Sequence, residues 1–489
     1  MNALIRCCLM AGAFLFCLAP IYLPAETEKD AGESKSPKRP PNIVLILCDN
    51  LGYGDLGCYG SKLHRTPHVD RLAAEGMKFT HLYASSGVCT PSRASLMTGC
   101  YPRRVNLHVS DKGRSVLQPV ASKGLHPDEI TVAEILKSRG YATTIIGKWH
   151  LGDQLPFLPT RQGFDSYLGI PYSDDMTARD GQIWPPLPLM QDEEVIDAPV
   201  DRNLLTRRYT EAAVEFMTAH REESFFLFLS HAMPGSTRTP YASEAFRGRS
   251  ANGPWGDSVE EIDWSTGEIL TALERLGLSD STLVIWTNDN GAPKRQPPQG
   301  VNLPLKGWGY DTSEGAMRVP LLARWPGQIP AGEVCDELST LMDLLPTFAE
   351  LAGAELPTDR VIDGKSIVPL LRNEAGAKSP HEAFYYYFMD QLQAVRSGPW
   401  KLYLKLDKPQ GRAKPEEFAE LRLYHLGDDP AETENVAREH PEVVDRLLQL
   451  AETAREDLGD GDRAGRNQRP AGHEPNPSPR VRTAENSEK

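Results

Sequence analysis

Residues 42–47 have the sequence Asn-Ile-Val-Leu-Ile-Leu, a continuous apolar run, and comparable runs lie at 142–146, 225–229, 282–286 and 319–323. Short all-apolar runs are typical of strands buried on both faces of a parallel sheet. Stretches with helical periodicity lie between or after them, at 68–77, 131–139, 205–220, 259–276 and 344–352. This alternation predicts an α/β/α sandwich around a mainly parallel sheet.

The pattern changes after about residue 365. Short apolar runs at 384–388, 394–396, 400–404 and 421–425 indicate antiparallel strands, and a helix is expected over 441–455. From residue 458 apolar side chains nearly vanish, which predicts a disordered tail. The expected organisation is therefore a main domain at 42–365, a small C-terminal α+β subdomain with an antiparallel sheet at 366–457, and a tail at 458–489.

The N-terminus has the features of an export signal. Arg6 precedes an apolar run at 7–23, and Ala25 offers a small residue for cleavage, so residues 1–25 are predicted to be a signal peptide and 26–41 a linker. A retained anchor is the alternative, although Pro20 and Pro24 interrupt the run. We expect an exported mature protein, in the periplasm, a lumen or the medium, with no membrane span.

Composition excludes several classes of protein. The chain has 489 residues, with 53 Lys+Arg against 67 Asp+Glu and a formal charge of −14, which argues against nucleic acid as a partner. A mean hydropathy of −0.42 excludes a multi-span membrane protein. The mature chain would keep an odd number of cysteines, so at least one thiol stays unpaired or is chemically used.

Two stretches carry chemistry. The first is Cys89-Thr90-Pro91-Ser92-Arg93, followed by Ala-Ser-Leu-Met-Thr-Gly at 94–99. A cysteine at a strand-to-helix turn can be activated by the helix N-terminus and a nearby arginine, although a lone cysteine is more often an unreactive loop residue. The second stretch, at 140–151, is Gly-Tyr-Ala-Thr-Thr-Ile-Ile-Gly-Lys-Trp-His-Leu.

Together these stretches resemble the two signatures of the sulfatase family, and Gly163-Phe164 with residues 169–173 resemble its arylsulfatase A-like branch. The resemblance runs from Asp49 to Pro320. It implies an alkaline-phosphatase-like fold and oxidation of Cys89 to formylglycine by a formylglycine-generating enzyme. In the family, one hydroxyl of the aldehyde hydrate attacks sulfur and the other later expels sulfate.

Two pairs of polar residues follow predicted strands, Asp49 with Asn50 and Asp289 with Asn290. Taken alone, each pair is more often a turn or a helix cap. Oxygen ligands at the carboxyl edge of a parallel sheet can form a hard-cation site. The resemblance implies that these four residues bind calcium together with residue 89. The family more often has Asp where this chain has Asn50.

The resemblance also assigns roles to five further residues. Arg93 would stabilise the formylglycine hydrate, Lys148 and Ser173 would lie at the sulfate, and His150 would assist proton transfer. His231, expected just after the strand at 225–229, would bind sulfate and protonate the leaving oxygen.

One lysine that is usual in the family is replaced by glycine in this sequence. The family's second sulfate-binding lysine usually lies where this chain has Gly309. Lys306 is the nearby candidate for a substrate-binding cation, and it either reaches the sulfate or faces outward.

The expected function is calcium-dependent hydrolysis of sulfate esters, with sulfated carbohydrates as substrates and aryl sulfates as surrogates. Loops at 174–202, 237–256 and 293–302 are predicted to form the pocket rim. Two alternatives remain: a phosphomonoesterase or phosphodiesterase of the same fold, and a non-catalytic glycan-binding relative.

Overall fold

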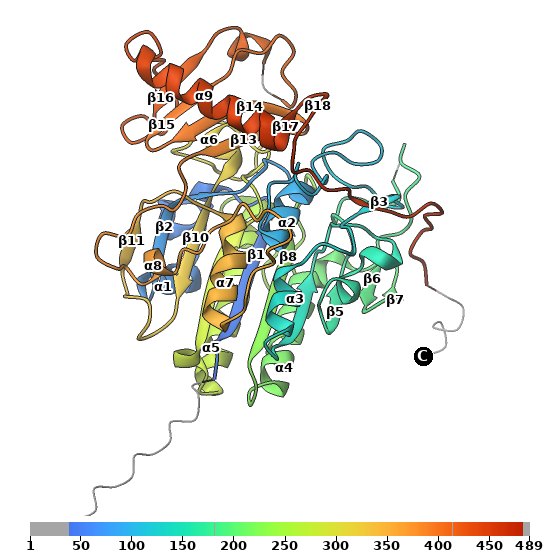
Figure 1. Cartoon of the computed structure of the whole chain (residues 1–489). Helices are drawn as coiled ribbons and strands as arrows, with labels where there is room; N and C mark the ends of the chain where they lie inside the picture. Colours follow the sequence, from blue (N-terminus) through green and yellow to red (C-terminus); the bar gives the residue numbers. More distant parts are fainter. Residues whose placement is uncertain (1–38, 180, 413, 483–489) are drawn as a thin grey trace, which may run out of the picture. The chain divides into compact units, whose positions relative to one another are not determined.

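The computed structural model describes residues 39–482 except 180 and 413 (Figure 1). The predicted signal peptide at 1–25 and nearly all of the predicted linker at 26–41 lie outside the described residues. Within the described ranges, none of the helices combines the length and apolar character that crossing a membrane requires.

The main sheet has eleven strands, in the order β11-β2-β10-β9-β1-β8-β4-β5-β6-β7, with β12 paired to β2. Central β1 (Asn42–Asp49) runs parallel to β8 (Phe225–Pro234) and β9 (Thr282–Asn288), and β4 (Ala142–Gly147) runs parallel to β8. The other strands are β2 (Met77–Tyr83), β5 (Ser166–Gly169), β6 (Leu189–Gln191), β7 (Glu194–Asp197), β10 (Arg318–Arg324), β11 (Glu333–Cys335) and β12 (Ser339–Thr340). The predicted mainly parallel sheet is confirmed.

The apolar run of β1 is buried on both faces, as predicted. Ile43, Leu45 and Leu47 belong to one core cluster, whereas Val44 and Ile46 belong to the other. Figure 1 shows α2, α3 and α7 over one face and α4 and α5 over the other. The helices of the main domain are α1 (Pro67–Ala74), α2 (Cys89–Thr98), α3 (Val132–Lys137), α4 (Leu205–Ala219), α5 (Gly253–Arg275), α6 (Glu314–Met317), α7 (Leu344–Ala352) and α8 (Val368–Leu371).

The small antiparallel sheet predicted for the C-terminal part is confirmed. Its strands are β13 (Phe384–Phe388), β14 (Gln391–Ser397), β15 (Trp400–Tyr403) and β16 (Arg422–His425), paired in chain order. Helix α9 (Pro441–Leu458) buries Val444, Leu447, Ala451 and Ala454 against this sheet. From Pro40 onward the contacts form one compact unit, so they do not divide the chain at residue 365.

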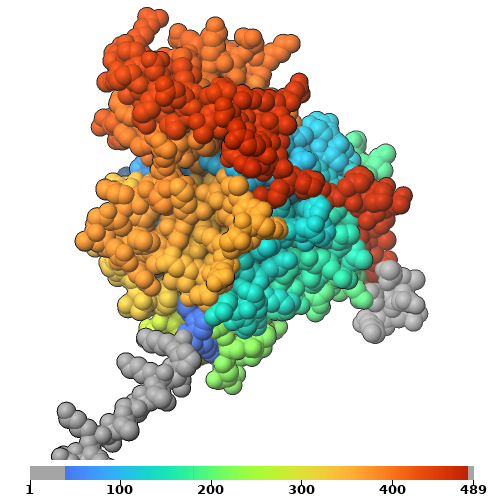
Figure 2. Space-filling model, in the orientation of Figure 1, coloured from blue at the N-terminus to red at the C-terminus, as the bar shows by residue number. Residues whose placement is uncertain are grey.

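The prediction of a disordered tail is wrong for residues 458–482. β17 (Gly459–Asp460) pairs with β18 (Arg463–Ala464), and β19 (Gly472–His473) pairs with β3 (Lys123–Gly124). Arg469 forms an ion pair of 2.7 Å with Glu129, and the Ser478 N–H donates to Gln154 Oε1 at 2.8 Å. Figure 2 shows this segment lying across the surface of the main domain. Backbone pairing and ion pairs hold a segment that has few apolar side chains.

Candidate active site

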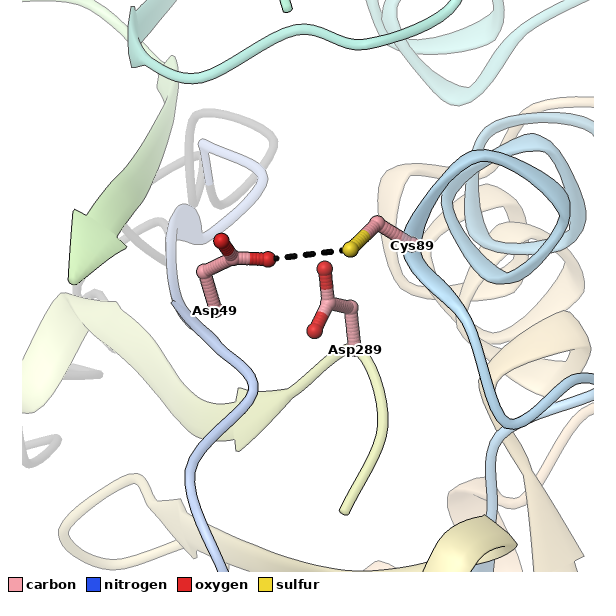
Figure 3. Close-up of side chains that lie close together, drawn as sticks. All are labelled: Asp49, Cys89 and Asp289. Carbon is pink, nitrogen blue, oxygen red and sulfur yellow. Dashed lines mark hydrogen bonds between the residues drawn. The ribbon is translucent and has the colours of Figure 1, made fainter. Parts of the chain in front are cut away.

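Two carboxylates and a thiol meet at the carboxyl edge of the parallel strands. Asp49 is the last residue of β1, and Asp289 directly follows β9. Cys48 of β1 pairs with Asn288 of β9, so the two aspartates are neighbours. Cys89 is the first residue of α2, and its Sγ lies 3.3 Å from Asp49 Oδ1. One ligand atom from each of Asp49, Cys89 and Asp289 lies within 4.8 Å of the other two (Figure 3).

Asn50 and Asn290 complete this edge. Asn50 Oδ1 lies 3.9 Å from Cys89 Sγ and accepts a hydrogen bond of 2.5 Å from Asn290 Nδ2. Asn50 has a left-handed φ of 61°, which asparagine tolerates better than most residues, and its N–H donates to Asp289 Oδ1 at 3.1 Å. The four predicted metal ligands are therefore brought together with Cys89.

The donor set fits a hard divalent cation. Burial raises the pKa of Asp49, but Lys148 and Arg93 outweigh it and the pKa falls to about 2. Burial and the charge of Asp49 raise the pKa of Asp289 to about 7. Among the described residues, Asp49 Oδ2 and Asn290 Oδ1 are buried without a hydrogen-bond partner. Calcium would provide a partner for these two oxygens.

Arg93 lies one turn after Cys89 and ties neighbouring elements together. Its Nε donates to Asp289 Oδ2 at 2.9 Å. Its Nη1 donates to the carbonyl oxygen of Lys148 at 2.9 Å and to Ser230 Oγ at 2.7 Å. Its Nη2 is buried and finds no hydrogen-bond partner in the part of the chain that the structure describes. One donor of Arg93 is thus left for a ligand.

Lys148 directly follows β4 and points at the same carboxylate. Its Nζ lies 2.7 Å from Asp49 Oδ1 and 3.3 Å from Ser173 Oγ. Burial lowers the pKa of Lys148, but the charge of Asp49 outweighs it and raises the pKa above its ordinary value. The side chain is therefore a buried cation, and the predicted proximity of Lys148 and Ser173 is present.

The His150 ring is held by the main chain. Its Nε2 lies 3.0 Å from the carbonyl oxygen of Leu117, and because a carbonyl only accepts, Nε2 carries the proton. Burial and the charge of Lys148 lower the pKa of His150 well below its ordinary value. Its Nδ1 is buried with no hydrogen-bond partner within residues 39–482. The neutral ring thus has one unused proton acceptor.

The structure does not bring His231 to this edge. β8 continues to Pro234, so His231 lies inside the strand and not after it. Its Nε2 lies 3.2 Å from Ser265 Oγ on α5, and burial alone lowers its pKa to about 3. Neighbouring Ser230 faces the other side of the sheet and contacts Arg93. The alternation of side chains along a strand therefore separates His231 from Cys89.

Lys306 is not brought to the site either. Its Nζ donates to the carbonyl oxygen of Glu432 at 3.4 Å and lies 5.8 Å from the centre of the Tyr424 ring. A cation–π contact and a carbonyl thus hold the ammonium against the C-terminal subdomain. Gly309 does lie beside the site, because a Cβ there would be 3.6 Å from Asn290 Nδ2.

Two serines near the end of β8 also contact the site, and no sequence motif pointed to them. Ser230 Oγ bridges Arg93 Nη1 and the carbonyl oxygen of Lys148, and Ser236 Oγ accepts a hydrogen bond of 2.9 Å from Asn50 Nδ2. Serine carries no motif of its own. The available signal for Ser236 was the mostly apolar sequence up to residue 233, which extends the strand and moves its polar end to this position.

Comparisons with known proteins agree with this geometry. The chain matches the family model "Sulfatase" over residues 41–354 and "N-sulphoglucosamine sulphohydrolase, C-terminal" over 306–457. Arylsulfatase A from Homo sapiens is 40% identical, covering 84% of this chain and 87% of that protein. N-acetylgalactosamine-6-sulfatase from Mus musculus is 37% identical, covering 86% of each. The solved structure of PsFucS1 sulfatase from Pseudoalteromonas sp. has a TM-score of 0.72 at 27% identity, covering 85% of this chain and 90% of that chain. By these matches the chain belongs to the sulfatase family.

Proposed function

We propose that this chain is an exported sulfatase that hydrolyses sulfate esters of carbohydrates, with formylglycine made from Cys89 and a bound calcium ion. The observation that carries the proposal is the position of Cys89. It begins α2, where the helix dipole favours an anion, and its Sγ lies 3.3 Å from Asp49 in a cluster of hard oxygen ligands.

Formylglycine supplies a hydrated aldehyde as nucleophile, and calcium supplies positive charge beside the ester. Lys148, a buried cation held between Asp49 and Ser173, binds a sulfate oxygen. Arg93 Nη2, which lies 3.6 Å from Asp49 Oδ1 and has no hydrogen-bond partner among the described residues, donates to a group at residue 89. Neutral His150 accepts a proton from a hydroxyl of residue 89 at its unpaired Nδ1.

The proposed substrate is a sugar sulfate. One relative that covers most of the chain is named for a sugar substrate, N-acetylgalactosamine 6-sulfate. The predicted rim loops supply Asp174 and Arg295, polar side chains that suit hydroxyl and sulfate groups.

Maturation has to precede folding. The Cys89 side chain is buried in the folded protein, with only 3% of its residue surface exposed. A formylglycine-generating enzyme therefore acts on the unfolded chain, which fits modification during export.

Mass spectrometry of the tryptic peptide 79–93 tests the proposal. After expression in the native host, we expect the mass loss that replaces the Cys89 thiol with an aldehyde, together with desulfation of at least one member of a panel of defined sulfated sugars. An unmodified thiol and an inert panel would contradict the proposal.

A non-catalytic glycan-binding relative is the second candidate. The observation that favours it is that His231 and Lys306 both point elsewhere and residue 309 is glycine. This candidate predicts binding of a sulfated sugar with no turnover, even when residue 89 is converted to the aldehyde.

A further inference from the structure

A group of rim side chains adjoins Asn50. Ser236 links this rim to the site, because its Oγ accepts from Asn50 Nδ2 at 2.9 Å and its carbonyl oxygen accepts from Arg295 Nη2. Arg295 is thus one residue removed from a predicted metal ligand, although it comes from the loop after β9 and Ser236 from the loop after β8.

Tyr310 places the rim next to residue 89. Burial, Cys89 and Asp175 raise the pKa of Tyr310 to about 12, with Ser236 acting in the opposite direction. The N–H of Tyr310 donates to the carbonyl oxygen of Gly87 at 2.9 Å, which holds the residue in place.

Gly309 leaves the wall beside Asn290 without a side chain. A Cβ at residue 309 would lie 2.7 Å from the carbonyl oxygen of Gly291, closer than real Cβ atoms come. No cation can project from residue 309 unless this backbone moves. A cation for this wall has to come from another loop.

Arg295 has the features of that cation. Its N–H donates to Gln299 Oε1 at 2.7 Å, which fixes the loop. Its Nε is buried and, within the described ranges, has no hydrogen-bond partner. Burial lowers the pKa of Arg295 despite the opposing fields of Tyr310 and Asp175, as expected for a guanidinium without a close carboxylate.

Its charge also differs from the two cations inside the site. Lys148 is paired with Asp49 at 2.7 Å and Arg93 with Asp289 at 2.9 Å, so carboxylates already offset both. Arg295 forms no such ion pair within the described residues, and Asp175 and Asp174 act on it only through their fields. The positive charge of Arg295 therefore remains available to a ligand.

We propose that Arg295 is a substrate-binding residue that holds the sulfate group of the ester from the rim, beside Lys148. The inference rests on the proposed sulfate-ester substrate. Through Arg295, the loop at 293–302 recognises the negative charge of the sulfate and distinguishes a sulfated sugar from the same sugar without sulfate.

Binding measurements on the full-length mature chain test this, in a Cys89→Ala background where turnover is impossible. The ligands are N-acetylgalactosamine 6-sulfate and unsulfated N-acetylgalactosamine, measured by calorimetry with calcium present. Arg295→Met should weaken binding of the sulfated sugar by about tenfold or more, the range of a charge-assisted hydrogen bond, and leave the unsulfated sugar unchanged. Arg295→Lys keeps the charge and should retain most of the selectivity.

Lys294→Met is the matched control, since it removes an adjacent but exposed charge and should change both affinities by less than about twofold. Equal loss of both ligands in Arg295→Met, or equal behaviour of the Met and Lys variants, would overturn the inference. Sulfate-selective binding that depends on Arg295, found in a protein whose Cys89 is never modified, would support the inference while contradicting the catalytic proposal.

Discussion

Two buried clusters in this protein each place a lysine among acids, and they differ in how completely their polar atoms are paired. Lys401 on β15 lies 3.0 Å from Glu314 and 2.9 Å from Glu432. Every carboxylate oxygen of these two glutamates has a hydrogen bond, from Tyr83, Tyr386, Tyr403, the Glu314 N–H or Lys401. Around Lys148, by contrast, Asp49 Oδ2 lacks any partner among the residues described.

This difference separates a structural cluster from a binding site. Burial raises the pKa of Glu314, but Lys401 and nearby arginines outweigh it and the pKa falls to about 2. At the other cluster the pKa of Asp289 rises to about 7. The network around Lys401 has all its carboxylate oxygens paired and joins the small sheet to the main domain, whereas the unpaired buried oxygens near Lys148 indicate that a ligand is needed.

The strongest test of the comparison is loss of Lys148. Lys148→Met should lower kcat/KM by about a thousandfold, because a buried cation is removed from the developing anionic charge. Its melting temperature in calcium should stay near that of the parent, because the metal offsets Asp49. Steady-state kinetics and calorimetry check this, and a large loss of stability with normal kcat/KM would contradict it.

The matching change at the structural cluster is Lys401→Met. It leaves two buried carboxylates without their cation and should cost about 3–5 kcal/mol of unfolding free energy. Chemical denaturation measures this. The folded fraction of the variant should keep the KM of the parent protein. A changed KM with an unchanged unfolding free energy would contradict the structural role of Lys401.

The unfolding free energy should depend on pH with opposite signs at the two clusters. Because the pKa of Asp289 is raised to about 7, unfolding free energy in metal-free buffer should fall as pH rises from about 4 to 7, and Asp289→Asn should remove this fall.

Because the pKa of Glu314 is lowered to about 2, its stabilisation should be complete above about pH 4.5 and be lost toward pH 2, and Glu314→Gln should remove that loss. Denaturation across pH measures both, and equal signs would refute the distinction.

The smallest expected effect is at Asn50. Asn50→Asp adds one ligand charge and should tighten calcium binding by roughly fivefold to tenfold while lowering stability without metal. Calcium titrations followed by thermal unfolding measure both quantities. An affinity unchanged by the added charge would place the cation away from residue 50.

Much of the site was predictable, because most of its residues lie at the ends of short apolar strands or in a contiguous motif. The resemblance to the family signatures gave Asp49, Asn50, Asp289 and Asn290 as metal ligands and Cys89 with Arg93 as a pair, and strand ends and one helical turn are local features that a sequence can show. The position expected for His231, just after the strand, was not found, because strand β8 extends beyond its first apolar run. The direction of the Lys306 side chain could not be predicted, because no local pattern shows which of two sheets a loop lysine approaches.

The α/β class, the central parallel strands and the signatures around Cys89 can be read from the chain alone, because apolar runs and short motifs are local properties. Long-range packing sets four other features: His231 faces α5, Lys306 joins the small sheet, residues 458–482 are held, and Arg295 and Asn50 share Ser236 as a partner. Each of these depends on a partner far away in the chain, and no local pattern encodes that partner.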